Sequence, residues 1–118
     1  MNPLDYSLCD QTVTLYRKSG ETVTRKVIAN AYLSKKVSVP NEAYGKSVEK
    51  TFLLIIPENA DLLQCGDRIF DGIGPETITW QAFVPAAVSE LYEISYVKPC
   101  RWDGEIIHWE AGNRKETL

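Results

Sequence analysis

The sequence is poor in the residues that build metal centres and covalent catalysts. His108 is its only histidine, and its three cysteines, Cys9, Cys65 and Cys100, lie far apart in a chain of 118 residues. A zinc site needs several Cys or His ligands, usually in closely spaced pairs, and the sequence contains no Cys-x-x-Cys pair. We therefore predict no metal site, and we expect the cysteines to be three reduced thiols, at least some of which pack as small apolar side chains.

Long apolar runs are also missing. The longest run, residues 52–56, has five residues and ends at Pro57, whereas a membrane-spanning helix needs about 20. The first ten residues, MNPLDYSLCD, include an acid at position 5 and no apolar stretch of signal-peptide length. We expect no membrane span and no export signal, with synthesis in the cytoplasm.

Positive charge is not in excess. The chain has 13 Lys and Arg against 16 Asp and Glu, a net charge of -3, whereas nucleic-acid binders usually gather positive charge against phosphates. A general DNA or RNA binder is therefore disfavoured. Hydrophobic residues make up 44% and charged residues 25%, which is typical of a globular chain, and the length fits one domain.

Alternating apolar and polar residues predict β-strands through the first half of the chain. Residues 11–18, QTVTLYRK, alternate with a period of two, the turn pair Ser19-Gly20 follows, and alternation resumes over residues 21–39. Because the second stretch is long for one strand, we expect a bend near Asn30. Residues 50–56, KTFLLII, form the most apolar strand, which we expect at the centre of the sheet.

The second half predicts further short strands separated by turn residues. Asp71-Gly72 is a turn pair, and short helical turns are expected after Pro57 and after Pro85. The later strands are predicted at residues 77–84, 92–98 and 105–110, with the last two joined by the turn WDG.

Together these patterns predict an all-β fold. We expect a small antiparallel β-barrel or sandwich of six or seven strands, with one or two short helical turns and a long loop between the second and third strands. We expect residues 1–118 to form a single domain, with the long loop at about 38–49 and a flexible tail from about 112 to 118. The expected core residues are Phe52, Leu54, Ile56, Ile94, Ile107 and Trp109.

His108 is the one residue that invites a catalytic interpretation. Alternation in GEIIHWE places Ile107 and Trp109 on the core face and His108 on the other face with Ile106 and Glu110. A catalytic histidine needs a nucleophile and an orienting group, and the sequence has no nucleophile motif to supply them. We predict a structural or interface histidine, with no catalytic residue and no cofactor.

The second half also resembles a known family. An apolar strand ends in Ile-Pro, a short turn leads to Gly-Asp-x-Ile and a Gly, and a late Ile-x-x-Val precedes a Gly turn and a His-Trp strand. This pattern over residues 52–112 resembles the minor capsid or head-tail connector proteins of tailed phages and prophages, including stopper-like head completion proteins. The third cysteine and the insertion GIGPE depart from it. The matching residues are Ile56, Pro57, Gly66, Asp67, Ile69, Gly72, Ile94, Val97, Gly104, His108 and Trp109.

The resemblance implies a structural protein of the virion, made in the bacterial host cytoplasm. It implies a homo-oligomeric β-barrel ring below the portal, with a portal-side adaptor and tail-side proteins as partners, and leaves a monomer open for the isolated chain. Packaged DNA passes nearby without sequence-specific binding. The loop between the second and third strands would project into the channel or contact neighbouring subunits, and its residues include Val39, Pro40, Asn41, Glu42, Tyr44 and Lys46.

Two other classes stay open. An OB-like nucleic-acid-binding barrel would place aromatic and basic side chains on one strand face. A small enzyme accessory domain would place His108 in a pocket beside an Asp or Glu.

Overall fold

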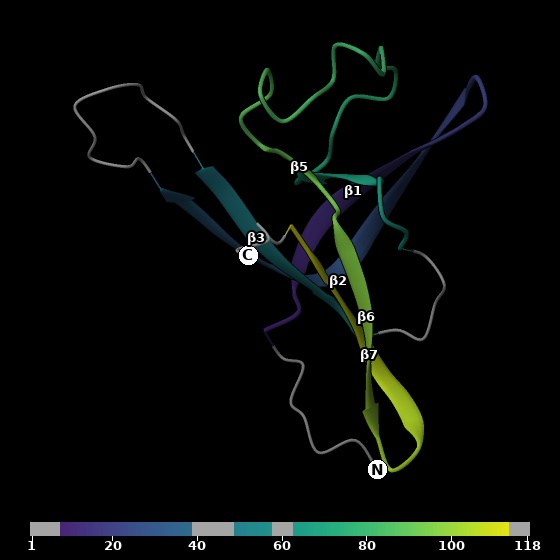
Figure 1. Ribbon diagram of the computed structural model, residues 1–118, viewed down its shortest axis with the longest axis vertical. Helices are drawn as coiled ribbons and strands as arrows, with labels where there is room; N and C mark the ends of the chain where they lie inside the picture. The colour runs from purple at the N-terminus through teal and green to yellow at the C-terminus, as the bar shows by residue number, and fades with distance from the viewer. Residues whose placement is uncertain (1–7, 39–48, 58–62, 114–118) are drawn as a thin grey trace, which may run out of the picture.

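A computed structural model describes residues 8–38, 49–57 and 63–113, and these residues form an all-β chain (Figure 1). No helix is present in these three segments. A single helical turn, in which the Val88 amide donates to the Val84 carbonyl at 2.9 Å, lies around Pro85, where a short helical turn was predicted. The predicted all-β class is therefore confirmed with seven strands. They are β1 (Gln11–Ser19), β2 (Thr22–Ser38), β3 (Glu49–Ile56), β4 (Arg68–Asp71), β5 (Leu91–Glu93), β6 (Tyr96–Trp102) and β7 (Glu105–Gly112).

The seven strands form one antiparallel sheet that curls on itself. Its order is β5-β4-β1-β2-β3-β7-β6, so β5 and β6 lie at opposite ends, yet only Ile94 and Ser95 separate them in the chain. The Ile94 amide donates to the Asp67 carbonyl beside β4, and the Ser95 amide donates to the Gly112 carbonyl of β7, both at 2.8 Å. The two ends of the sheet must therefore approach each other, which gives a barrel-like curl.

β2 bends at the predicted position. Asn30 has a φ of 61°, and the ladder with β1 shifts register there, since Gln11 pairs with Ala31 while Val13 pairs with Ile28. A bulge of this kind bends the strand and increases its twist. β2 pairs with β1 before the bend and with β3 from Tyr32 onward. β2, not the apolar strand β3, is therefore the middle strand of the sheet, because its length lets it serve two neighbours.

The turn WDG also forms as predicted. Asp103 and Gly104 have φ values of 52° and 82° and connect Trp102 to its partner Glu105. Two successive residues with positive φ define a type I′ hairpin turn, for which Asp-Gly is a favoured pair.

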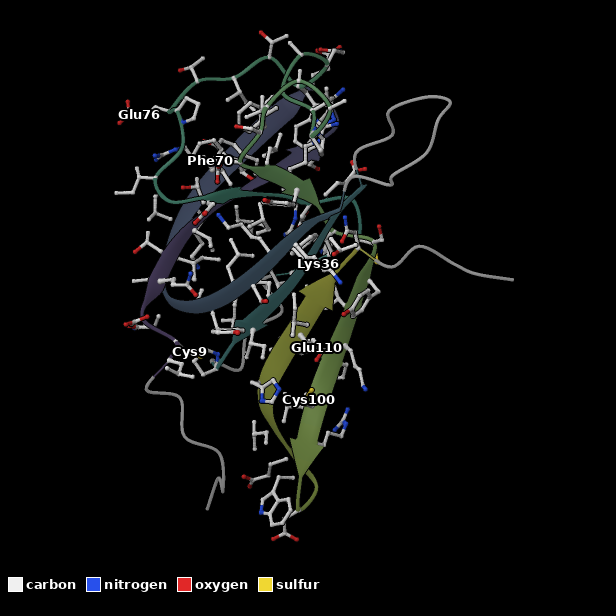
Figure 2. All side chains as sticks on the ribbon, turned by 90° about the vertical axis from the view of Figure 1, so that its left-hand side faces the viewer. Cys9, Lys36, Phe70, Glu76, Cys100 and Glu110 are labelled. Carbon is white, nitrogen blue, oxygen red and sulfur yellow. The ribbon has the colours of Figure 1, made fainter. Side chains whose placement is uncertain are left out.

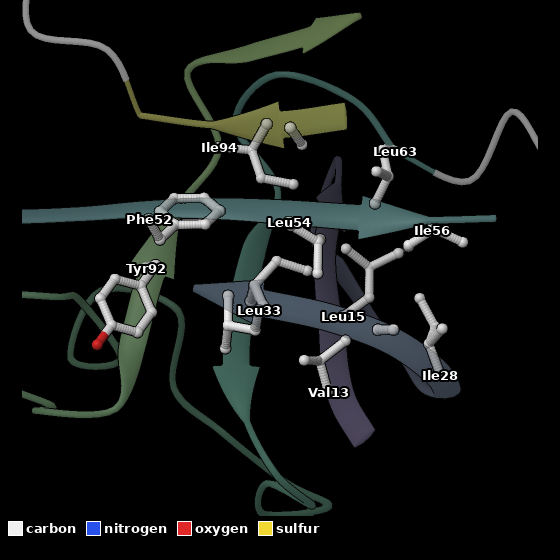
Figure 3. Close-up of a cluster of buried hydrophobic side chains, with 13 residues drawn as sticks. Val13, Leu15, Ile28, Leu33, Phe52, Leu54, Ile56, Leu63, Tyr92 and Ile94 are labelled. Atoms are coloured by element: carbon white, nitrogen blue, oxygen red, sulfur yellow. The ribbon is translucent and has the colours of Figure 1, made fainter. Parts of the chain in front are cut away.

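The main core fills the inside of the curl (Figure 3). Phe52, Leu54, Ile56 and Ile94 belong to it, and Trp109 is half-buried against its edge. Ile107, which we expected in the core, is half-buried outside this cluster, because β3 pairs with β7 only from Trp109 onward. The cluster consists of Val13, Leu15, Ile28, Ala31, Leu33, Phe52, Leu54, Ile56, Leu63, Ile69, Tyr92, Ile94 and Ala111.

A second apolar cluster lies on the opposite face of β1. Tyr16 alternates with Leu15 along β1 and packs with Phe83 and Leu91, with the two rings edge-on at a centroid distance of 4.8 Å. Residues 72–90, which we call the cap, cover this cluster. The predicted strand at residues 77–84 is wrong, because the Thr79 carbonyl accepts from the amides of Ala82 and Phe83 and turns the chain back on itself.

The predicted strand at residues 92–98 is also wrong as a single element. It is divided at Ile94 and Ser95 into β5, which pairs with β4, and β6, which pairs with β7. Its alternating pattern is continuous in sequence, but closure of the curl requires the chain to change neighbours at this point.

Candidate functional site

His108 faces a cysteine across the β6–β7 hairpin. His108 and Cys100 are direct cross-strand partners, and His108 is only 8% exposed. Burial lowers the pKa of His108, against a smaller opposing effect of Glu110, and burial raises the pKa of the Cys100 thiol. A nucleophilic cysteine needs the reverse, a lowered thiol pKa beside a charged imidazole. Both shifts favour the neutral forms of the two side chains, the opposite of what an activated Cys-His pair needs.

The other thiols are free as well. Cys9 is buried and Cys65 is exposed, and the Cys65 Sγ lies 3.3 Å from the Ser95 carbonyl oxygen. Burial raises the pKa of Cys9, which disfavours the reactive thiolate.

Residues 8–38, 49–57 and 63–113 contain no group of three or more His, Cys, Asp or Glu side chains that could hold a metal ion. The same segments contain no helix long and apolar enough to cross a membrane.

The β2–β3 hairpin extends beyond its neighbours. The ladder runs from the Tyr32–Ile55 pair to the Ser38–Glu49 pair, while β7 covers only Leu53–Ile56 of β3. Residues 35–38 and 49–52 therefore form a two-stranded stalk past the end of β7. The predicted loop residues Val39, Pro40, Asn41, Glu42, Tyr44 and Lys46 belong to the connection at its end and lie outside the described residues.

The base of the stalk is fixed to the far end of the sheet. The Lys35 ammonium contacts the Asp71 carboxylate and lies 3.3 Å from that of Glu90. Hydrogen bonding to Asp71 is the largest cause of the raised Lys35 pKa. On the core side, the rings of Phe52 and Tyr92 are in contact at a centroid distance of 5.3 Å. An ion pair and an aromatic pair thus tie the stalk to the segment around β5.

Gly112 lets the chain approach the stalk closely. A Cβ atom there would lie 2.7 Å from the Phe52 carbonyl oxygen and 2.8 Å from the Tyr96 ring. Next to it, the Asn113 side-chain oxygen accepts a hydrogen bond from the Phe52 amide at 3.0 Å. The end of β7 therefore packs directly against the stalk backbone, which only glycine permits.

The β6–β7 hairpin carries a second projecting surface, the β6–β7 arm (residues 100–108). Figure 2 shows it standing apart from the rest of the sheet, with Cys100 at its base. Residues 101–105 are all exposed, and Trp102 is 51% exposed beside the turn. The place of Trp102 directly before an Asp-Gly turn is a sequence signal for the tip of a hairpin.

Arg68 attaches the cap to the sheet. Its guanidinium is largely buried and donates to the carbonyls of Trp80 at 2.5 Å and Phe83 at 2.6 Å. Two further donors hold the start of the cap, because the Tyr16 hydroxyl donates to the Pro75 carbonyl at 2.5 Å and Arg25 donates to the Gly74 carbonyl at 2.7 Å. The cap is therefore a fixed part of the fold.

Asp67, directly before β4, ties this strand to β1. Its buried carboxylate accepts two hydrogen bonds from the Arg17 guanidinium, at 2.8 and 2.6 Å, and a third from the Gln64 amide at 2.9 Å. Hydrogen bonding to Asp67 is the largest cause of the raised Arg17 pKa. The contacts of Arg68 and the Asp67–Arg17 pair could not be predicted from the sequence, because the partners lie on another strand or in the cap.

The chain matches no protein-family model, no curated protein and no solved structure. Its candidate site is therefore defined by its own geometry, as the stalk and the β6–β7 arm that project from a curled sheet.

Proposed function

We propose that this chain is a structural protein of a tailed phage or prophage, acting as a stopper-like subunit of the head-tail connector. In this proposal it forms a ring below the portal, between a portal-side adaptor and tail-side proteins, and works in the virion after synthesis in the host cytoplasm. It acts by shape and contact and performs no catalysis. The resemblance of residues 52–112 to such proteins motivates the proposal.

The observation that carries the proposal is the anchored stalk. A subunit that closes a channel must hold a loop at a defined place under load. Here the β2–β3 ladder continues to Ser38 and Glu49, and Lys35 and Phe52 fix its base to Asp71 and Tyr92. Functional loops are often carried on rigid scaffolds of this type.

The hairpin architecture also supports an assembly role. A two-stranded ribbon is marginally stable alone in water and gains most from a partner. The stalk and the β6–β7 arm are both ribbons of this kind, and the arm exposes Trp102. Exposed tryptophan is enriched where protein surfaces meet.

Removal of the gene from the producing phage tests the proposal. We expect full heads that leak DNA or remain unjoined to tails in electron micrographs, restored by the wild-type gene supplied in trans. Mass spectrometry of purified wild-type particles should detect the chain at a few copies per particle, as for a single ring. Normal, infectious particles without the gene would refute the proposal.

A further inference from the structure

Charge is separated along the fold. Residues 8–38 contain six basic side chains (Lys or Arg) and two acidic ones (Asp or Glu). Residues 63–113 contain three basic and eight acidic side chains. The basic excess is densest in residues 17–27, the outer part of the β1–β2 hairpin, with four basic side chains and one acidic. Net charge alone hides this polarity.

The β1–β2 hairpin has an unpaired sheet edge. β3 pairs with β2 from Tyr32 onward, so residues 22–30 of β2 have β1 as their one strand partner in the described part of the chain. Such edges are templates for contact with another chain. Val27, on this edge, is 40% exposed, and its neighbour Lys26 is exposed too.

The β6–β7 arm has the complementary character. The arm contains two acidic side chains, Asp103 and Glu105, which flank the turn beside exposed Trp102, and one basic side chain, Arg101. Arg101 belongs to β6, whereas Glu105 belongs to β7. The acidic side of the tip is therefore the side formed by the turn and β7.

The two surfaces lie far apart in one molecule. Figure 1 shows the β1–β2 tip toward the upper end of the long axis and the β6–β7 tip at the lower end. One chain therefore cannot join its own two surfaces, but two copies can. A contact between different surfaces of identical copies is head-to-tail, and it makes a ring if its rotation closes.

We propose that the β6–β7 arm of one copy docks on the β1–β2 hairpin edge of the next, with Trp102 against Val27 and with Asp103 and Glu105 beside Lys18 and Lys26. The inference rests on the proposed function for the need of a ring, and names the surfaces that form it. Opposite charges orient the approach, and burial of Trp102 and Val27 stabilises the contact.

A charge-swap experiment on the purified full chain tests the docking. Sedimentation velocity from about 10 µM to about 1 mM, the range of weak specific association, should show concentration-dependent assembly that high salt weakens. Lys26→Glu alone and Glu105→Lys alone should each weaken assembly by about tenfold or more. An equimolar mixture of the two variants should assemble again, because every contact between one variant and the other joins opposite charges.

Matched controls carry the same charge changes elsewhere. Lys98→Glu on β6, outside the arm and the stalk, and Glu76→Lys on the cap should assemble like the wild type, and Trp102→Ala should assemble weakly. Circular dichroism should show that every variant is folded.

Three results would overturn the inference: a wild type that stays monomeric throughout, a mixture that does not assemble, or a Lys26→Glu defect seen only in binding a DNA oligonucleotide. The last would assign the basic hairpin to phosphate contacts instead. If the charge swap fails while gene removal still leaves heads unjoined, the docking surfaces are wrong and the connector function stands. If the swap succeeds while gene removal has no effect, the chain assembles head-to-tail in another role.

Discussion

Arg68 lies flat over Trp80, with its guanidinium carbon 3.7 Å from the ring centroid. The same guanidinium donates to the Trp80 and Phe83 carbonyls, and its Nε lies 3.6 Å from a Glu93 carboxylate oxygen. One side chain from β4 thus satisfies the backbone of a long irregular segment and stacks on its aromatic ring. The 19 residues of the cap, 72–90, depend on this contact because they contain no strand of their own.

Arg68→Ala should therefore loosen the cap and destabilise the fold. The change removes two charge-assisted hydrogen bonds and leaves two carbonyls without their donor, at a cost of about 3 kcal/mol. Chemical denaturation measures the loss, and hydrogen exchange should show faster exchange at Phe83 and Val88. Arg101→Ala, an exposed control, should cost less than about 0.5 kcal/mol. Equal effects of the two substitutions would contradict the role of Arg68.

Trp109 and Trp102 provide a matched pair of tryptophans. Trp109 packs against the main core, so Trp109→Ala should cost about 3 kcal/mol, the lower end for large core truncations because Trp109 is only half-buried. Trp102→Ala should leave stability within about 0.5 kcal/mol, since its ring is exposed. Urea denaturation measures the free energy of unfolding of both variants. A large loss in Trp102→Ala would mean that the Trp102 ring packs within the monomer.

His108 should make stability depend on pH. Burial lowers its pKa from the ordinary value of 6.5, so the unfolded chain binds a proton more readily than the folded chain. The contribution of neutral His108 to the free energy of unfolding is complete above about pH 7, and it is lost as the pH falls below 6.5. Melting temperatures of the wild type should fall between pH 7 and pH 5 more steeply than those of His108→Gln. Parallel curves would exclude a buried neutral His108.

Gly112→Ala should distort the junction between β7 and the stalk. The new methyl group would overlap the Phe52 carbonyl and the Tyr96 ring, and the backbone oxygen cannot move as a flexible side chain could. We expect a loss of about 1–3 kcal/mol, the usual range for overpacking. Thermal denaturation measures it, and an unchanged melting temperature would show that the junction is loose.

Local sequence signals predicted the features that local geometry determines. The bend at Asn30 follows from a strand too long to stay straight. The turn at Asp103-Gly104 follows from two residues that tolerate positive φ. The cap and the break between β5 and β6 were not predictable in this way. The pattern at residues 77–84 alternates like a strand, but Arg68 donates hydrogen bonds to the Trp80 and Phe83 carbonyls, and only the folded sheet brings these groups together.

The candidate site shows the same division. The sequence predicted the hairpins and their turns, and it marked residues 38–49 as a long connection. It did not reveal that Lys35 and Phe52 anchor the base of the stalk, because Asp71, Glu90 and Tyr92 approach them only through curling of the sheet.

Deletion of residues 40–45 tests the central claim most directly. The described ladder ends at Ser38 and Glu49, and the main core is formed by residues outside this segment. The account predicts a melting temperature close to that of the wild type for the shortened chain, together with particles that lose DNA or fail to join tails. Infectious particles in normal yield from a phage carrying only the shortened chain would contradict it.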